Sequence, residues 1–230
     1  MSLIRVLEQE VMDTVEEATD FNRMDHSAVN KLFAEDLFAA GYEGGDTLDV
    51  GTGTALIPAE ICRQAVLRQF ASPLRIMAID MSTKMLDLAR YNIEIAGVAQ
   101  QIQLAQVDAK QMPYSSEMFD AVISNSIVHH IPDPVAVLRE CFRVVREGGL
   151  LFVRDLLRPA SDADVSRLVA MYAGEENAHS QKMFDDSLRA ALTLAEIREL
   201  VACVGGNPED VAATSDRHWT WSARKAIRPI

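Results

Sequence analysis

The chain has 230 residues, of which 49% are hydrophobic and 24% charged, and its formal net charge at pH 7 is −12. This length and composition suit a globular protein with one well-formed core. A surface this acidic repels phosphate backbones, so a nucleic-acid partner is disfavoured. No apolar run approaches the roughly 20 residues that span a bilayer, so no membrane partner is expected.

The N-terminal residues lead quickly into the acidic side chains Glu8 and Glu10, which is not typical of a signal peptide. Three cysteines lie far apart in apolar helical patterns, without metal-ligand spacing: Cys62, Cys141 and Cys203. We therefore expect buried free thiols and a cytoplasmic protein.

Two amphipathic segments open the chain. Residues 3–17 carry apolar side chains at four-residue steps, which predicts a helix, and a second helix is expected from about Ser27 to Ala40. We expect residues 1–41 to form a helical unit that either caps the ligand site or packs on the edge of the following sheet. The first helix would cover either its own sheet or another subunit, which leaves a homo-oligomer open.

A glycine turn follows the first predicted strand. Residues 47–50 form a short apolar strand that runs into Gly51 and Gly53, and a helix begins near Leu56. Strand, glycine turn and helix together are typical of the ligand-binding entrance of a doubly wound α/β sheet. Asp49 precedes the turn and Asp80 ends the next apolar run, so two carboxylates would meet a ligand with ribose hydroxyls and a positive charge.

Strands and helices then alternate through the rest of the chain. Further strands are expected near residues 76–80, 102–107, 119–125 and 150–153, followed by a hairpin of two strands within residues 211–226. Helices are expected from residue 56 to about 69, 83 to 95, 134 to about 148, and 194 to about 204. Ser82 and Thr193 are the predicted caps of two of these helices.

The glycine turn carries a resemblance to a known family. Residues 49–55, Asp-Val-Gly-Thr-Gly-Thr-Ala, resemble the motif of class I S-adenosylmethionine-dependent methyltransferases, which is an acidic residue, any residue, and Gly-x-Gly-x-Gly. Ala55 replaces the third glycine and still permits close packing. The resemblance covers roughly residues 46–225 and implies S-adenosylmethionine as cofactor, with S-adenosylhomocysteine as product.

The resemblance also implies the fold. We expect an α/β protein with a doubly wound, mainly parallel seven-stranded sheet and one antiparallel edge strand. Residues 42–230 would form the Rossmann-like methyltransferase domain, and residues 156–192 a helical lid inserted between the fifth and sixth strands.

The resemblance places the cofactor at the carboxyl ends of the first four strands. The implied cofactor-binding residues are Asp49, Gly51, Thr52, Gly53, Asp80, Met81, Asp108, Ala109 and Asn125. Asp80 would hold the ribose hydroxyls, and Met81 would pack on the adenine. Three of these residues have plainer alternatives: Asp80 as a helix N-cap, Asp108 as a solvated turn residue and Asn125 as a turn former.

Two histidines, His129 and His130, follow the fourth strand and are the catalytic candidates. A histidine titrates near pH 6.5 and can take a proton from an oxygen or nitrogen nucleophile, although such a histidine also often only packs against the next helix. No metal site is expected, because the third and fourth ligands would have to come from His26, Asp155 or His179.

Four further residues are candidates to face a substrate: Arg154 and Asp155 at the end of the fifth strand, and Tyr172 and His179 in the lid. Each of them could equally be a packing or surface residue.

The sequence therefore predicts methyl transfer from S-adenosylmethionine to a small or medium-sized acceptor through an oxygen, nitrogen or carbon nucleophile. One alternative is a module that binds S-adenosylmethionine or a partner protein without turnover. A nicotinamide-dependent oxidoreductase is a weaker alternative, because Leu56 stands where its third glycine belongs.

Overall fold

The computed structural model describes residues 3–11, 13–68, 70 and 72–227. Its α-helices are α1 (Val15–Arg23), α2 (Ser27–Ala39), α3 (Leu56–Ala65), α4 (Thr83–Ile95), α5 (Pro134–Val144), α6 (Asp162–Tyr172), α7 (Ala178–Ala190) and α8 (Leu194–Cys203). Its strands are β1 (Asp46–Val50), β2 (Arg75–Asp80), β3 (Ile102–Gln106), β4 (Phe119–Asn125), β5 (Val145–Leu156), β6 (Val211–Ala213) and β7 (His218–Arg224). Two short 3₁₀ helices are η1 (Val128–His130) and η2 (Pro208–Asp210).

The seven strands form one sheet in the order β3-β2-β1-β4-β5-β7-β6. Strands β1 to β5 pair in parallel, while β7 runs antiparallel to both β5 and β6. The mainly parallel seven-stranded sheet predicted from the sequence is thus confirmed. The reversed strand was expected at the edge of the sheet. It is β7, which lies next to the edge, because β6 is the edge strand.

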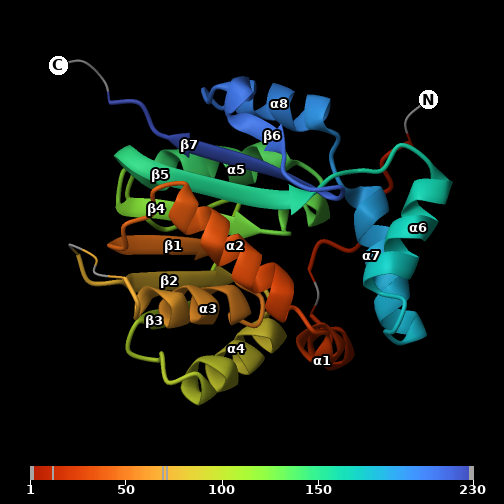
Figure 1. The fold of residues 1–230 in the computed structure, drawn as a ribbon. Coiled ribbons are helices and arrows are strands. Elements are labelled where there is room, and N and C mark those ends of the chain that lie inside the picture. The colour runs from red at the N-terminus through yellow and green to blue at the C-terminus, as the bar shows by residue number, and fades with distance from the viewer. Residues whose placement is uncertain (1–2, 12, 69, 71, 228–230) are drawn as a thin grey trace.

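Helices cover both faces of the sheet, and each face has its own apolar core (Figure 1). On one face Phe33 of α2, Ile61 of α3 and Ile93 of α4 pack against strand residues. On the other face Leu138 of α5 and Ile197 of α8 do the same. This two-sided burial explains why the strands read as nearly continuous apolar runs in the sequence.

Local capping signals fix two of these helices. The Ser82 hydroxyl accepts a hydrogen bond from the backbone N–H of Met85 at the start of α4. Thr193 and Glu196 form a reciprocal capping box at the start of α8. Both predicted caps are confirmed. They could be predicted from the sequence because their hydrogen bonds join residues only three positions apart.

The helix predicted over residues 3–17 is wrong. Residues 3–11, called the N-terminal strap below, have no regular secondary structure, and α1 starts at Val15 behind a Thr14–Glu17 capping box. The backbone N–H of Val6 donates to the carbonyl of Arg189. The guanidinium of Arg5 donates to three further carbonyls, those of Ala190, His129 and Ile131. The strap is therefore held by distant backbone groups that its own spacing could not reveal.

Two predicted helix ends also differ. The helix expected to continue to about residue 148 ends at Val144, because Val145 already pairs with Phe119. The fifth strand is correspondingly longer than residues 150–153. Helix α3 ends at Ala65, whereas Gln69, the expected end, lies outside the described residues.

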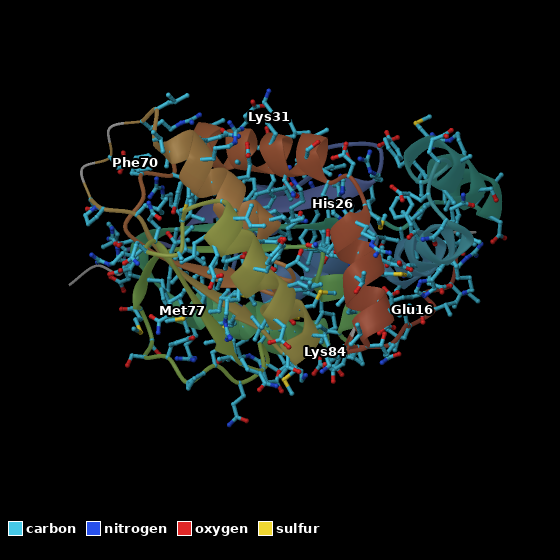
Figure 2. All side chains as sticks on the ribbon, turned by 90° about the horizontal axis from the view of Figure 1, so that it is seen from below. Glu16, His26, Lys31, Phe70, Met77 and Lys84 are labelled. Carbon is cyan, nitrogen blue, oxygen red and sulfur yellow. The ribbon has the colours of Figure 1, made fainter. Side chains whose placement is uncertain are left out.

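Helices α1, α6 and α7 gather at the end of the sheet toward which the parallel strands point (Figure 1). Seen from below, α1 lies between α4 and the lid helices α6 and α7 (Figure 2). His179 Nδ1 of α7 is 2.8 Å from Asp20 Oδ2 of α1, so lid and N-terminal segment are in contact. In the part of the chain that the structure describes, no helix is both long and apolar enough to cross a membrane.

Candidate active site

A cavity of about 570 Å³ lies at the carboxyl ends of the parallel strands. It is bounded by β1 and β4, where the strand order reverses, and by α1, α2 and the lid helix α7. Open α/β sheets bind ligands at this kind of switch point, and the volume falls within the roughly 300–1,000 Å³ typical of small-molecule sites. All nine residues that the sequence implied for the cofactor line this cavity.

Gly51 and Gly53 are each needed in the turn, but for different structural reasons. Gly51 has a φ of +73°, and a Cβ there would lie 2.0 Å from the side chain of Ile127, so protein packing already excludes any side chain. Gly53 has a φ of +55°, and the nearest atom to its Cβ position belongs to Phe21 at 3.7 Å. The backbone at Gly53 therefore leaves open space, which a ligand can approach closely.

Asp49 ends β1 beneath this turn and is buried, with a relative exposure of 3%. Its Oδ2 atom has no hydrogen-bond partner among the described residues. Burial raises the pKa of Asp49 to about 7; the nearby Thr52 hydroxyl acts to lower it, and the Asp80 carboxylate adds to the rise. A buried carboxylate oxygen without a donor is costly, and a cationic group in the cavity would compensate for that cost.

Asp80 ends β2 and links the glycine turn to α4. Its two carboxylate oxygens accept hydrogen bonds of 2.8 Å from the backbone N–H groups of Gly53 and Ser82. Burial raises the pKa of Asp80 in spite of these donors. The N-cap of α4 is Ser82 and not Asp80, so the helix cap that the sequence left open for Asp80 is supplied by its neighbour.

A second wall of the cavity comes from Met81, Asp108 and Ala109. Met81 is 48% exposed and lines the cavity, so its side chain offers a surface on which a flat ring can pack. Asp108 pairs with the ammonium of Lys110 at 3.1 Å, and Lys110 also pairs with Glu10 of the strap. Partial burial alone would raise the pKa of Asp108, but its bonds to Lys110 lower it below the ordinary value.

Asn125 is the last residue of β4, and the chain bends directly after it at Ser126. The Asn125 amide donates to the Ser126 hydroxyl at 3.1 Å, and Ser126 has a φ of +58°. Asn125 lines the cavity from the last position of β4, and its role toward the cofactor stays a prediction.

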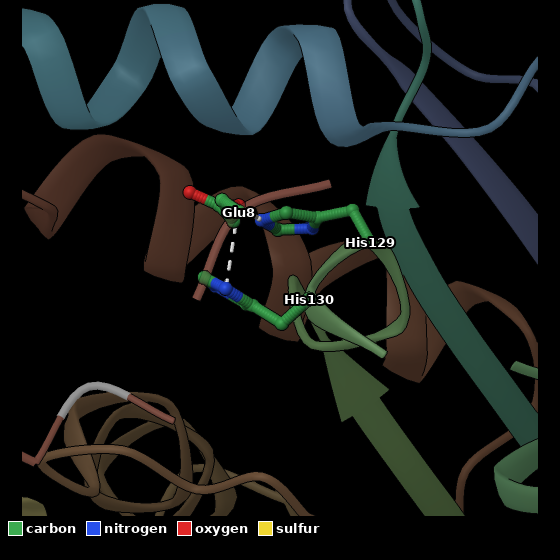
Figure 3. Close-up of side chains that lie close together, drawn as sticks. All are labelled: Glu8, His129 and His130. Carbon is green, nitrogen blue, oxygen red and sulfur yellow. Dashed lines mark ion pairs between the residues drawn. The ribbon is translucent and has the colours of Figure 1, made fainter. Parts of the chain in front are cut away.

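His129 lies in η1, directly after this bend, and is buried. Its Nδ1 atom is 2.5 Å from Asp155 Oδ1, and its Nε2 atom is 3.4 Å from Oε1 of Glu8 in the strap (Figure 3). Burial alone would lower the pKa of His129, but the Asp155 and Glu8 carboxylates raise it. Asp155 also accepts a hydrogen bond from the backbone N–H of Val128, which fixes the carboxylate in place.

His130 stacks beside His129, with ring centroids 4.2 Å apart. Burial, together with the neighbouring His129, lowers the pKa of His130 to about 3, so its ring is neutral at physiological pH. Both histidines line the cavity.

The four candidates for substrate contact separate into two groups. Arg154 and Tyr172 line the cavity, whereas Asp155 and His179 are not among the described residues that do. The Arg154 guanidinium already donates to Asp36 at 2.7 Å, and the Tyr172 hydroxyl donates to Asp216 at 3.0 Å. Arg154 and Tyr172 are thus held by protein partners, and Asp155 contacts the cavity-lining His129.

Sequence reasoning missed the contribution of the strap and of the apolar wall. Glu10 of the strap lines the cavity, and Glu8 lies directly behind it, against the two histidines. The apolar wall comes from α1, α2 and α7 and consists of Phe21, Val29, Leu32, Met183 and Phe184. No local pattern places these residues at the cavity, because the fold alone brings the strap and the lid to the sheet.

Residues 48–153 match the family described as methyltransferase domain. A 106-residue stretch is 34% identical to phosphatidylethanolamine N-methyltransferase from Cereibacter sphaeroides and covers 46% of this chain and 48% of that protein. This chain thus spans about half the length of that relative. A longer stretch of 187 residues is 26% identical to ubiquinone biosynthesis O-methyltransferase from Xanthomonas euvesicatoria pv. vesicatoria, covering 80% of this chain and 72% of that one.

The fold is likewise that of a solved protein, a SAM-dependent methyltransferase from Aquifex aeolicus. The TM-score is 0.66 at 16% sequence identity, with 91% of this chain and 97% of that chain covered. A glycine turn, a sheet of this order and these sequence matches lead to one conclusion: residues 48–153 form a methyltransferase domain, and the chain as a whole has the fold of a SAM-dependent methyltransferase.

Proposed function

We propose that this protein transfers the methyl group of S-adenosylmethionine to a small-molecule acceptor with an apolar body. The observation that carries the proposal is the buried Asp49 carboxylate, which lines the cavity and has one oxygen without a hydrogen-bond donor among the described residues. An α-ammonium group is the kind of partner that such a carboxylate needs. In a nicotinamide dinucleotide, by contrast, a pyrophosphate would come to this turn and would be repelled.

The donor side of the cavity is the wall around the glycine turn. Asp49 binds the amino group, either directly or through water, and the open backbone at Gly53 lies along the methionine part. The Asp80 carboxylate accepts hydrogen bonds from the ribose hydroxyls. Met81, Asp108 and Ala109 surround the adenine. When bound, S-adenosylmethionine supplies an electrophilic methyl group on a positively charged sulfur.

The acceptor side is the apolar wall, together with His129 and His130. Helices α1, α2 and α7 place apolar side chains there, and these exclude water from an acceptor of matching shape. Positioning two reactants can supply roughly 7–11 kcal/mol, whereas a general base adds only about 10²–10⁴-fold in rate. The main task of these residues is therefore to align and desolvate the acceptor.

The acceptor atom is an oxygen or a nitrogen in this proposal, because one relative named above is an N-methyltransferase and the other an O-methyltransferase.

We further propose a cytoplasmic location without a nucleic-acid partner. Its support is the net charge of −12 and the three free cysteines, of which Cys62 and Cys141 are buried while Cys203, expected to be buried, is exposed. Whether copies of the chain associate stays a prediction tied to residues 1–41.

The test is calorimetric titration with S-adenosylhomocysteine, with NAD and NADH as control ligands. Wild type is expected to bind S-adenosylhomocysteine and neither nicotinamide. Asp80→Ala and the isosteric Asp80→Asn are expected to weaken binding at least about tenfold, because charged acceptors form the stronger hydrogen bonds. Transfer of a labelled methyl group to a panel of phenols and amines then identifies the acceptor class.

Asp87→Ala is the matched control, since Asp87 is an exposed aspartate of α4 that does not line the cavity. It should bind like wild type. Absence of binding by folded wild type would refute the proposal. Binding without transfer to any acceptor would favour the non-catalytic module instead.

A further inference from the structure

Three side chains that can bind a metal meet beside the cavity: Glu8 from the N-terminal strap, and His129 and His130 from η1. One ligand atom from each lies within 4.8 Å of the other two. Figure 3 shows both imidazole rings turned toward the Glu8 carboxylate. We propose that Glu8, His129 and His130 form a binding site for a divalent transition-metal ion, with zinc as the ion that this ligand set suits.

The distances favour a metal over a hydrogen-bonded cluster. Glu8 Oε1 is 3.4 Å from His129 Nε2 and 3.3 Å from His130 Nδ1. Charge-assisted N–H···O bonds measure about 2.7–2.9 Å. Two ligands bound tetrahedrally to zinc through bonds of about 2.0–2.1 Å lie roughly 3.3–3.4 Å apart. The observed separations therefore match ligands arranged around an ion.

One oxygen of the Glu8 carboxylate, Oε1, has ion-pair contacts with the two histidines but no hydrogen bond among the described residues. The Oε1 atom is also buried. The other oxygen, Oε2, accepts a hydrogen bond from the Ser187 hydroxyl at 3.3 Å, which orients the carboxylate. A cation between Oε1 and the two rings would give Oε1 the partner that it lacks, and it would replace the contact of 3.3 Å between His130 Nδ1 and the Gln9 carbonyl.

The surroundings of His129 are those of a metal ligand. Asp155 binds Nδ1, which leaves Nε2 directed at Glu8. A carboxylate on the far nitrogen fixes the tautomer and orientation of metal-binding histidines and strengthens them as ligands. Sequence reasoning missed this site because it sought the third ligand at His26, Asp155 and His179, and not at Glu8.

Hydrogen bonds from Arg5 hold the strap, and with it Glu8, next to the two histidines. Arg5, three residues before Glu8, donates to the backbone carbonyls of His129, within the histidine pair, and of Ile131, directly after it. Both histidines line the cavity, so the fourth coordination position is open to water or to a molecule bound there. Three protein ligands and one open position are the arrangement of catalytic zinc sites.

The experiment is calorimetric titration of the EDTA-treated, metal-free protein with zinc chloride. We expect one zinc per chain in wild type, and binding at least about tenfold weaker in Glu8→Gln and in His130→Ala. Asp155→Asn is expected to weaken zinc binding by about 10–100-fold, the usual effect of losing such a supporting carboxylate. Circular dichroism in EDTA shows whether each variant is folded.

His179→Ala is the matched control. Glu16, Asp20 and His179 form the other such group among the described residues, and they are mostly exposed. This variant should bind zinc like wild type. Cobalt(II) added to wild type provides a second readout that needs no variant, because tetrahedral coordination produces intense visible absorption bands.

Three results would each overturn the proposal: no stoichiometric zinc in wild type, unchanged affinity in both Glu8→Gln and His130→Ala, or loss of binding in His179→Ala alone. The metal site is tested by binding and not by turnover. Its failure would therefore leave the methyl-transfer proposal standing, and the reverse holds as well.

Discussion

Asp49 shows how a single buried carboxyl can couple ligand binding to pH. Its pKa of about 7 means that near neutral pH the folded protein holds a mixture of charged and neutral Asp49. A cationic amino group binds the charged form and therefore favours loss of the proton. In the absence of ligand, the raised pKa makes the contribution of Asp49 to folding stability fall as pH rises from about 4 to 7.

Affinity for S-adenosylhomocysteine should therefore increase with pH. Between pH 6 and pH 8 the charged fraction of a group with a pKa near 7 rises about tenfold, and affinity should rise by a similar factor. Asp49→Asn should bind more weakly and lose this dependence. Calorimetric titration in buffers of constant ionic strength measures both effects.

Asp108→Asn is the control for this titration. The pKa of Asp108 is lowered, so its carboxylate stays ionised over this range and its loss should leave the pH slope unchanged. A wild-type affinity that is flat from pH 6 to pH 8, or an Asp49→Asn variant with the wild-type slope, would refute this assignment.

At the level of elements, two capping boxes of the same type support helices of very different importance. Thr193 starts α8, which buries Ile197 and Val201 in a core. Thr14 starts α1, in which Ala18 is the buried residue. Equal local chemistry should thus have unequal effects on global stability.

Thr193→Ala is expected to lower the free energy of unfolding by about 1 kcal/mol, the usual effect of losing a cap. Thr14→Ala should change it by less than about 0.5 kcal/mol, because α1 can open while the sheet stays folded. Urea denaturation followed by tryptophan fluorescence measures both, since Trp219 and Trp221 are fully buried in β7. Equal losses in the two variants would mean that α1 unfolds together with the sheet.

The same comparison explains what the sequence could predict. Caps, strand ends and glycine turns depend on residues within a few positions of one another, so α4, α8 and the residues at the glycine turn could be located. The strap depends on Arg5 and on carbonyls more than 120 positions away, and its apolar spacing resembled that of a helix. The contact of Glu8 with His129 was hidden for the same reason, because it exists only in the folded chain.

At the level of the whole molecule, the net charge of −12 restricts the partners. Binding to nucleic acid comes largely from neutralising phosphates with lysine and arginine, and here acidic residues outnumber these by 34 to 22. The surface as a whole should repel a polyanion.

We therefore expect no shift of duplex DNA or of transfer RNA in native gels at micromolar protein and about 150 mM salt. A basic protein of similar size is the positive control. A shift that weakens steeply as salt is added would reveal a local basic groove and would contradict the expectation.

The position of β7 between β5 and β6 determines the order in which the sheet can be completed. During synthesis β6 leaves the ribosome first, yet within the sheet it pairs only with β7, so it has no strand to join until residues 218–224 follow. Until then β5 offers an unpaired, largely apolar edge, the kind of edge to which another nascent chain can attach. Pairing of β7 with β5 therefore covers an edge that would otherwise be open to another chain.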